Sequence, residues 1–257
     1  MIKFFRKIRY DLMNQNKTTK YFKYAIGEIV LVVIGILIAL QINNWNENRK
    51  DIAKEQQILL SLQEEFKQNI KELEFDHQIN LGSINAIKTL LNFDENTDFE
   101  TRTIDSLIGQ AYNFATFDAR LGVINDLSSS GNLELIRDSK LRYVLNQWTG
   151  ELNDYKEDII IRRDYWIHNM PHLVNKLLPA RNQDAFMNRE DYVRDILIKP
   201  IQVPKSNYIK FLSSLEIDSF LFDYYMNQSY VTTNEETIMK FLKSTLELIE
   251  SNINQNK

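Results

Sequence analysis

The longest hydrophobic segment of this 257-residue chain is the run at residues 24–42. Its nineteen residues, YAIGEIVLVVIGILIALQI, include only two strongly polar side chains, Glu28 and Gln41. At about 1.5 Å of rise per residue, a helix of this length extends roughly 28 Å, which is close to the thickness of the hydrocarbon core of a bilayer. The run therefore predicts one transmembrane helix.

Small residues recur along this predicted span. Gly27, Gly35 and Ala39 lie near one stripe of the helix, and small residues there let two membrane helices approach closely. We expect a homo-oligomer or a membrane-protein partner to pack against this stripe. Glu28 lies about one turn inside the span, where its carboxylate either reaches the lipid headgroups or contacts a partner.

Aromatic residues flank the predicted span. Tyr21, Phe22 and Tyr24 lie at its start, and Trp45 follows its end. Aromatic side chains of this kind concentrate where the lipid bilayer meets water. We expect these four side chains to act as interfacial anchors.

The formal charge changes sign across the span. Residues 1–23 carry +6, whereas the rest of the chain carries −10. Lysine and arginine close to a span are retained on the cytoplasmic side, so this asymmetry predicts a cytoplasmic N-terminus and an exported region at residues 43–257. In a Gram-negative cell the protein is then a single-pass inner-membrane protein with a periplasmic domain.

The basic leader contains a second membrane signal. Apolar residues at helical spacing alternate with a basic face, which predicts an interfacial helix at residues 2–13 on the anionic inner leaflet. The apolar residues are Phe4, Phe5, Ile8 and Leu12, and the basic residues are Lys3, Arg6, Lys7 and Arg9. The alternative is a disordered charged leader that only sets the orientation.

A cleaved signal peptide is the alternative to an anchor. Residues 41–45 lack the small-x-small pattern that cleavage requires, so we expect the span to remain uncleaved. The chain has no cysteine, which excludes disulfides, thiol catalysis and lipoprotein-type acylation. The acidic exported region lacks a phosphate-neutralising face, which argues against nucleic acid as a partner.

Beyond the span the pattern predicts an all-α, bundle-like domain, because the whole chain has only seven glycines and four prolines. The predicted helices cover residues 46–91, 103–116, 118–130, 139–171, 206–215, 218–228 and 233 onward. Pro171 ends or kinks one of them, and Pro200 and Pro204 bracket a predicted bend near residues 200–205. Residues 219–230 also have strand propensity, but a lone strand would have no pairing partner.

Helix ends are predicted from capping residues. Asp118 is a predicted N-cap, Gly131 suits the position just after a helix, and Asp138 or Ser139 is the predicted N-cap of the helix that follows. Thr233 to Glu236 form a capping box, S/T-x-x-E, that predicts the start of the last helix.

Residues with catalytic or metal-binding potential are few. Asp164, His168 and His172 would share one helix face, but Pro171 lies among them and the acid of an HExxH motif is absent. Residues 128–131, SSSG, are typical of a helix end rather than a nucleophile. No phosphate-binding loop or GxSxG motif is present, so we expect no catalytic residue, no metal and no cofactor.

Two residue groups allow either a structural or a functional interpretation. The acids Glu64, Glu65, Glu72 and Glu74 are predicted to lie on solvated helix faces. The aromatics are predicted to form core, with an apolar ligand pocket between helices as the alternative. They are Tyr165, Trp166, Phe220, Phe222, Tyr224 and Tyr225.

The segment KYAIGEIVLVVIGILIALQINNWNE at residues 23–47, with the preceding FFRK at residues 4–7, resembles the N-terminus of an uncharacterised family of single-span membrane proteins from flavobacteria and related bacteria. The segment LSSSGNLELI at residues 127–136, with Trp148 beyond it, resembles the middle of that family. The resemblance covers roughly the first 50 residues strongly and the rest loosely. It implies an inner-membrane anchor with a mostly helical exported domain, and it implies no activity.

Three functional hypotheses follow. The first is a non-enzymatic, membrane-anchored helical interaction or scaffold protein. The second is a sensory or ligand-binding helical domain, which would have to signal through a partner because only about 23 residues are predicted to be cytoplasmic. The third is an enzyme whose site the sequence does not reveal.

Overall fold

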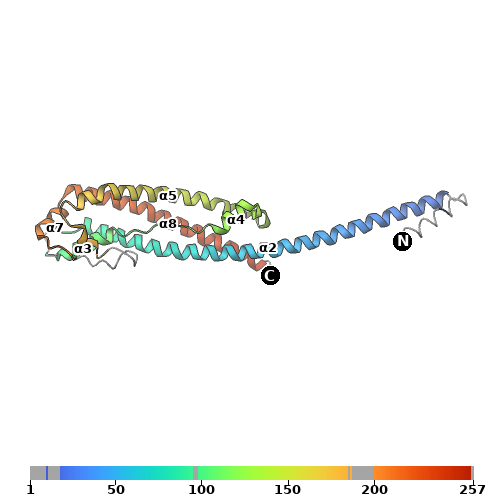
Figure 1. Cartoon of the computed structure of the whole chain (residues 1–257), viewed down its shortest axis with the longest axis horizontal. Helices are drawn as coiled ribbons and strands as arrows, with labels where there is room; N and C mark the ends of the chain where they lie inside the picture. The colour runs from blue at the N-terminus through green and yellow to red at the C-terminus, as the bar shows by residue number, and fades with distance from the viewer. Residues whose placement is uncertain (1–9, 11–17, 95–97, 185, 187–198, 256–257) are drawn as a thin grey trace. The chain divides into compact units, whose positions relative to one another are not determined.

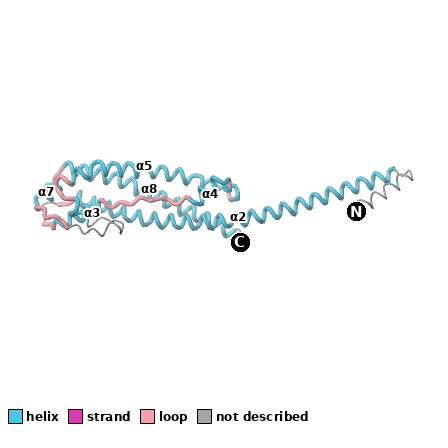
Figure 2. Tube along the Cα trace, in the orientation of Figure 1, coloured by secondary structure: helices cyan, strands magenta, loops and turns pink. Residues whose placement is uncertain are grey.

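The computed structural model describes residues 10, 18–94, 98–184, 186 and 199–255. These residues form α-helices and one short 3-10 helix, with no strand among them (Figures 1 and 2). The all-α fold class is therefore confirmed. The elements are α2 (Thr18–Leu91), α3 (Thr101–Ala111), α4 (Gly122–Ser130), the 3-10 helix η1 (Asn132–Leu135), α5 (Ser139–Val174), α6 (Ala180–Asp184), α7 (Lys205–Leu212) and α8 (Leu215–Gln255).

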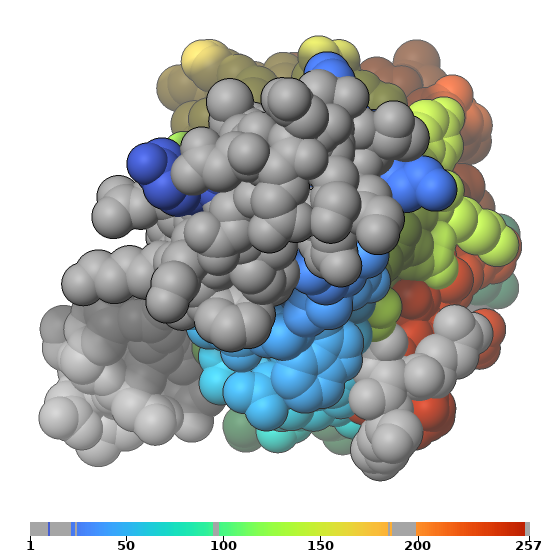
Figure 3. All heavy atoms as spheres, turned by 90° about the vertical axis from the view of Figure 1, so that its right-hand side faces the viewer, coloured from blue at the N-terminus to red at the C-terminus, as the bar shows by residue number. Residues whose placement is uncertain are grey.

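The chain divides into an N-terminal unit, residues 1–57, and a C-terminal unit, residues 58–257. In the N-terminal unit, α2 contains the only described segment that is long and apolar enough to cross a membrane, with a mean hydropathy of 2.6 over its most apolar window. Every large apolar side chain from Ile26 to Ile42 is exposed, and side chains of this blue part of α2 are visible at the surface in Figure 3. The predicted interfacial helix at residues 2–13 lies outside the described residues, apart from Tyr10.

In the C-terminal unit, the second half of α2 runs beside α5 and α8 (Figure 1). The three helices share one apolar core, and α5 buries one apolar stripe in it. Buried members of this core include Leu59, Leu62, Phe66 and Leu73 of α2, Leu141, Leu145, Trp148, Leu152, Tyr155 and Ile159 of α5, and Ile238, Leu242 and Ile249 of α8. A second apolar cluster joins α3, α7 and the C-terminal part of α5 to the start of α8.

Two predicted helix ends are confirmed. The Asp138 carboxylate accepts hydrogen bonds from the backbone N–H groups of Lys140 at 2.8 Å and Leu141 at 3.3 Å, as an N-cap does. Gly131 follows α4 with φ at 71°, a left-handed conformation that glycine adopts without steric cost. These local signals were readable because each acts within a few residues of its own chain position.

The predicted helix at residues 118–130 starts late, at Gly122, and the preceding helix ends early, at Ala111. The reason is tertiary. The side-chain amide of Asn80 bonds both the N–H and the C=O of Ala115, and the amide of Asn69 does the same for Arg120. With their backbone groups satisfied by α2, residues 113–121 form a non-helical connector instead of a helix.

The predicted break between residues 228 and 233 is wrong, because α8 is one continuous helix. The Thr233 hydroxyl donates to the carbonyl of Ser229, four residues earlier in the same helix. Thr233 is therefore not an N-cap, and the strand alternative for residues 219–230 is also excluded.

Pro171 lies inside α5, which continues three residues further to Val174. Residues 199–204, around the two prolines, are not helical, and α6 is a short helix that the pattern did not predict.

Candidate functional site

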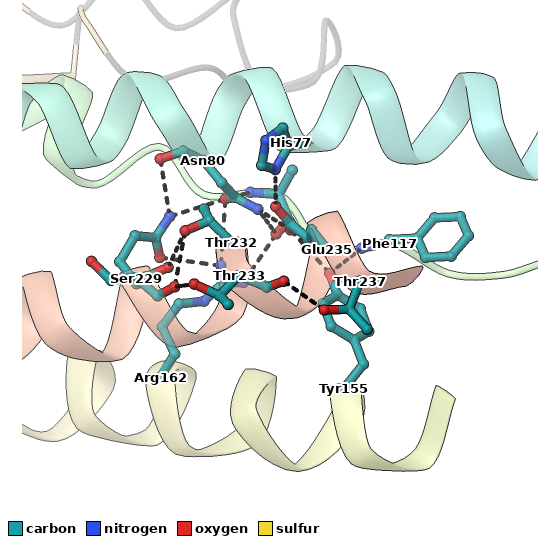
Figure 4. Close-up of polar contacts among 12 residues, drawn as sticks. His77, Asn80, Phe117, Tyr155, Arg162, Ser229, Thr232, Thr233, Glu235 and Thr237 are labelled. Carbon is teal, nitrogen blue, oxygen red and sulfur yellow. Dashed lines mark hydrogen bonds and ion pairs between the residues drawn. The ribbon is translucent and has the colours of Figure 1, made fainter. Parts of the chain in front are cut away.

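Buried polar side chains gather in the interior of the C-terminal unit, where α2, α5 and α8 meet the connector at residues 113–121 (Figure 4). Four of them, Asn80, Arg162, Gln228 and Glu235, have 0% exposed surface. A buried polar group destabilises the fold unless it is hydrogen-bonded, and a buried charge does so more strongly. The arrangement of partners therefore decides what this cluster does.

Glu235 of α8 is the negative charge of the cluster. Its Oε1 accepts a hydrogen bond from Asn80 Nδ2 at 2.6 Å and another from the Tyr155 hydroxyl at 3.2 Å. Its Oε2 lies 2.8 Å from His77 Nδ1, which must be the donor because an ionised carboxylate only accepts. Burial, followed by the nearby Glu235 charge, raises the pKa of Tyr155 far above its usual range, so this hydroxyl remains protonated and able to donate.

Arg162 of α5 is the positive charge of the cluster. Its Nη1 donates to Gln228 Oε1 at 3.1 Å, and its Nη2 donates to the carbonyl of Ala115 at 3.0 Å. The guanidinium carbon also lies 4.7 Å from the centre of the Phe114 ring, within range of a cation–π contact. Burial lowers the pKa of Arg162 from its usual value.

Asn80 links the two charges. It donates to Glu235, and its Oδ1 accepts from Gln228 Nε2 at 3.1 Å and from Arg162 Nη1 at 3.4 Å. One network thus joins three helices and the connector. Because its four central members have no exposed surface, no substrate reaches them in this conformation. The network links α2 to α5 and α8 through directional hydrogen bonds, and a polar core network of this kind can specify one packing.

The sequence analysis missed this network. Glu235 was predicted to belong to a capping box, and no buried role was predicted for it. A signal was present, because Glu235 lies four residues after Val231 and three before Ile238, both of which are buried. A polar residue at a core position of a helix indicates a buried partner, although not which one.

Asp76, next to His77, gives a pH prediction. Burial, and then the charges of Glu235, Glu72 and Asp118, raise its pKa from 3.8 to about 6. The native state therefore binds more protons than the unfolded state between about pH 4 and 6, and the free energy of unfolding decreases as the pH rises through this window. We expect Asp76→Asn to stabilise the protein at pH 7 by about 1 kcal/mol, allowing for solvent screening of this half-buried group.

The stability gained by Asp76→Asn should shrink below pH 6 and vanish near pH 4, where the wild-type Asp76 carboxyl is also neutral. Thermal unfolding at several pH values measures it. The control is Glu64→Gln, an exposed acid on the same helix. A gain of equal size at pH 4 and pH 7 would contradict the assignment.

The prediction of solvated acids is wrong for Glu65, which is only 9% exposed. Its Oε2 accepts from the Val123 backbone N–H at 2.8 Å, at the N-terminus of α4. Burial raises its pKa, and the backbone hydrogen bonds oppose that rise. Glu65 thus supplies from α2 the cap that α4 lacks locally. Glu72 and Glu74 instead form surface ion pairs. Glu72 pairs with Arg120 at 3.3 Å, and Glu74 pairs with Lys243 at 2.7 Å.

The predicted membrane-packing residues all lie on α2. A Cβ added at Gly27 or Gly35 would meet no atom within 4 Å, Ala39 is exposed and Glu28 is half-buried. At the two ends of the span, the side chains of Phe22 and Trp45 are exposed, and the Arg49 guanidinium lies over the Trp45 ring. Tyr21 and Tyr24 belong to the helix, but their side chains lie outside the described residues.

The remaining sequence candidates have structural roles. His168 Nδ1 donates to the carbonyl of Asp164, and the described residues contain no group of three potential metal ligands. Ser130 Oγ donates to the carbonyl of Asp126 within α4, as at an ordinary helix end. Among the aromatics, Phe220 and Tyr224 are buried and stack in the second apolar cluster, with Tyr165 stacked on Phe220. Phe222 is instead half exposed.

Part of the chain is similar to a known protein family. No curated protein and no solved structure matches the chain. Residues 28–152, from the candidate span to the middle of α5, are similar to DUF6090, a family of unknown function. The match supports the expectation of an uncharacterised family without assigning an activity.

Proposed function

We propose that this protein is a non-enzymatic, membrane-anchored helical interaction protein, with residues 24–42 as an uncleaved inner-membrane span. The observation that carries the proposal is that every large apolar side chain between Ile26 and Ile42 is exposed. A helix that is apolar on all sides and has no core to cover it requires lipid or another helix around it.

The direction of insertion rests on charge. The leader of residues 1–23 carries +6, which favours a cytoplasmic N-terminus, and the acidic C-terminal unit is then periplasmic. Protease added to intact spheroplasts should digest the C-terminal unit. Survival of that unit, or a mature chain that begins after residue 42, would contradict this topology.

The interaction itself is assigned to the stripe of Gly27, Gly35 and Ala39. Small residues allow close packing of membrane helices, and the two glycines have open space at their Cβ positions. We expect Gly35→Leu to reduce self-association or partner capture by about fivefold, equivalent to roughly 1 kcal/mol of helix packing. Crosslinking in native membranes, followed by gentle extraction, measures the yield.

The matched control is Val33→Leu, which enlarges a side chain on roughly the opposite face of the same helix. Its crosslinking yield should equal that of the wild type. A chain that crosslinks to nothing, or that crosslinks equally well with Gly35→Leu, would contradict the proposed interaction.

A further inference from the structure

A pocket of about 380 Å³ lies between the C-terminal part of α5 and α6, with Tyr112 in its wall. Its volume falls within the range of small-molecule sites, and apolar atoms form most of its lining, as is typical of such sites. The residues that line it include Tyr112, Trp166, Met170, Val174, Arg181 and Gln183. It involves no residue of the span, and of the six aromatics that the sequence suggested as pocket residues, only Trp166 lines it.

Three of the lining side chains have buried polar atoms without a hydrogen-bond partner among the described residues. These atoms are the Tyr112 hydroxyl, Trp166 Nε1 and Gln183 Oε1. Gln183 Nε2 donates to Asp105 Oδ1 at 2.8 Å, which assigns the amide orientation and leaves Oε1 as the unpartnered acceptor. Burial holds the pKa of Tyr112 well above its usual value of 10, so its hydroxyl stays protonated.

Unpartnered buried polar groups destabilise a fold, and native proteins contain few of them. Three in the wall of one pocket are explained if a ligand satisfies them. Two of the groups donate, Tyr112 and Trp166, and one accepts, Gln183. The ligand must therefore both accept and donate hydrogen bonds, which a carboxamide does and a carboxylate does not.

We propose that this pocket binds a small neutral molecule with an aromatic or alicyclic body and a carboxamide-like polar end. The apolar wall of Met170, Val174 and the Trp166 ring contacts the body. Arg181 and Asp184 also line the pocket with opposite charges, so the lining gives no net preference for an anion. The three polar atoms are buried, so binding includes a rotation of side chains in the pocket wall.

The test titrates full-length protein in nanodiscs with phenylacetamide and, separately, with the nearly isosteric phenylacetate. The Trp166 indole N–H signal, identified by its loss in Trp166→Phe, reports binding by nuclear magnetic resonance. We expect phenylacetamide to bind with a Kd on the order of 1 mM, as suits ten non-hydrogen atoms, and phenylacetate about tenfold more weakly.

Tyr112→Phe separates a binding role from a packing role. It removes only an unpartnered hydroxyl, so Tm should stay unchanged or rise, whereas the affinity for phenylacetamide should fall about fivefold. Tyr230→Phe, at a tyrosine that is 60% exposed, is the control and should change neither quantity. Equal affinities for the two probes, no signal change up to about 10 mM, or an unaltered Kd in Tyr112→Phe would overturn the proposal. None of these results bears on the proposed anchor, which the crosslinking and protease experiments test.

Discussion

Arg162→Met should destabilise the C-terminal unit by about 3–5 kcal/mol, the range measured when one member of a buried charge pair is removed. Methionine has a similar length, so the expected loss comes mainly from polar interactions. Without the guanidinium, the Glu235 carboxylate stays fully buried without the arginine charge of the network, the Gln228 Oε1 atom loses its Arg162 donor, and the Ala115 carbonyl loses one of its two side-chain donors. Thermal unfolding of the full chain should show a decrease in Tm of roughly 10 °C.

Arg163→Met is a matched control, because the neighbouring arginine is exposed and forms a surface ion pair with Asp164 at 3.5 Å. Its effect should stay below about 0.5 kcal/mol. If the two variants unfold at the same temperature, the buried network does not stabilise the bundle as described.

Removing both charges tests the same network in another way. Arg162→Met combined with Glu235→Met should cost less than the sum of the two single variants, since no uncompensated charge remains in the interior. Additive losses would show that the two groups act independently despite their shared partner, Asn80.

Phe66→Ala should destabilise the protein by about 3–5 kcal/mol, as is usual for a large aromatic side chain removed from a close-packed core. Phe66 is fully buried on α2, and its ring centre lies 6.1 Å from that of Trp148 on α5. Trp148 in turn stacks on Phe241 of α8, with ring centres 5.4 Å apart. The cavity would therefore open where all three long helices meet. Chemical denaturation of the full chain measures the loss.

Phe75→Ala on the same helix is the control, because that ring is 65% exposed. We expect a change within about 0.5 kcal/mol, which is ordinary for a surface position. A similar loss in both variants would mean that the effect of Phe66→Ala does not come from the burial of this ring in the core.

The accuracy of the sequence-based predictions depended on the distance over which the deciding interaction acts. The caps at Asp138 and Gly131 depend on residues within a few positions of the helix end, and these predictions are confirmed. The start of α4 and the partners of Glu235 depend on side chains from α2. Glu65 caps α4 from 58 residues earlier in the chain, and Glu235 bonds to Asn80 from 155 residues later. The capping residue Asp118 suggested a local helix start, and the contacts from α2 override it.

The sequence by itself determined the helical class, the single apolar segment and the sign of the charge on either side of it, because periodicity, length and composition follow directly from the order of residues. Only the tertiary structure decided that Asn80, Arg162 and Glu235 meet, and that Tyr112, Trp166 and Gln183 line one pocket. A hydrophobic pattern specifies which face of a helix is buried. It does not specify which polar groups on different helices face one another, since that depends on the register in which the helices pack.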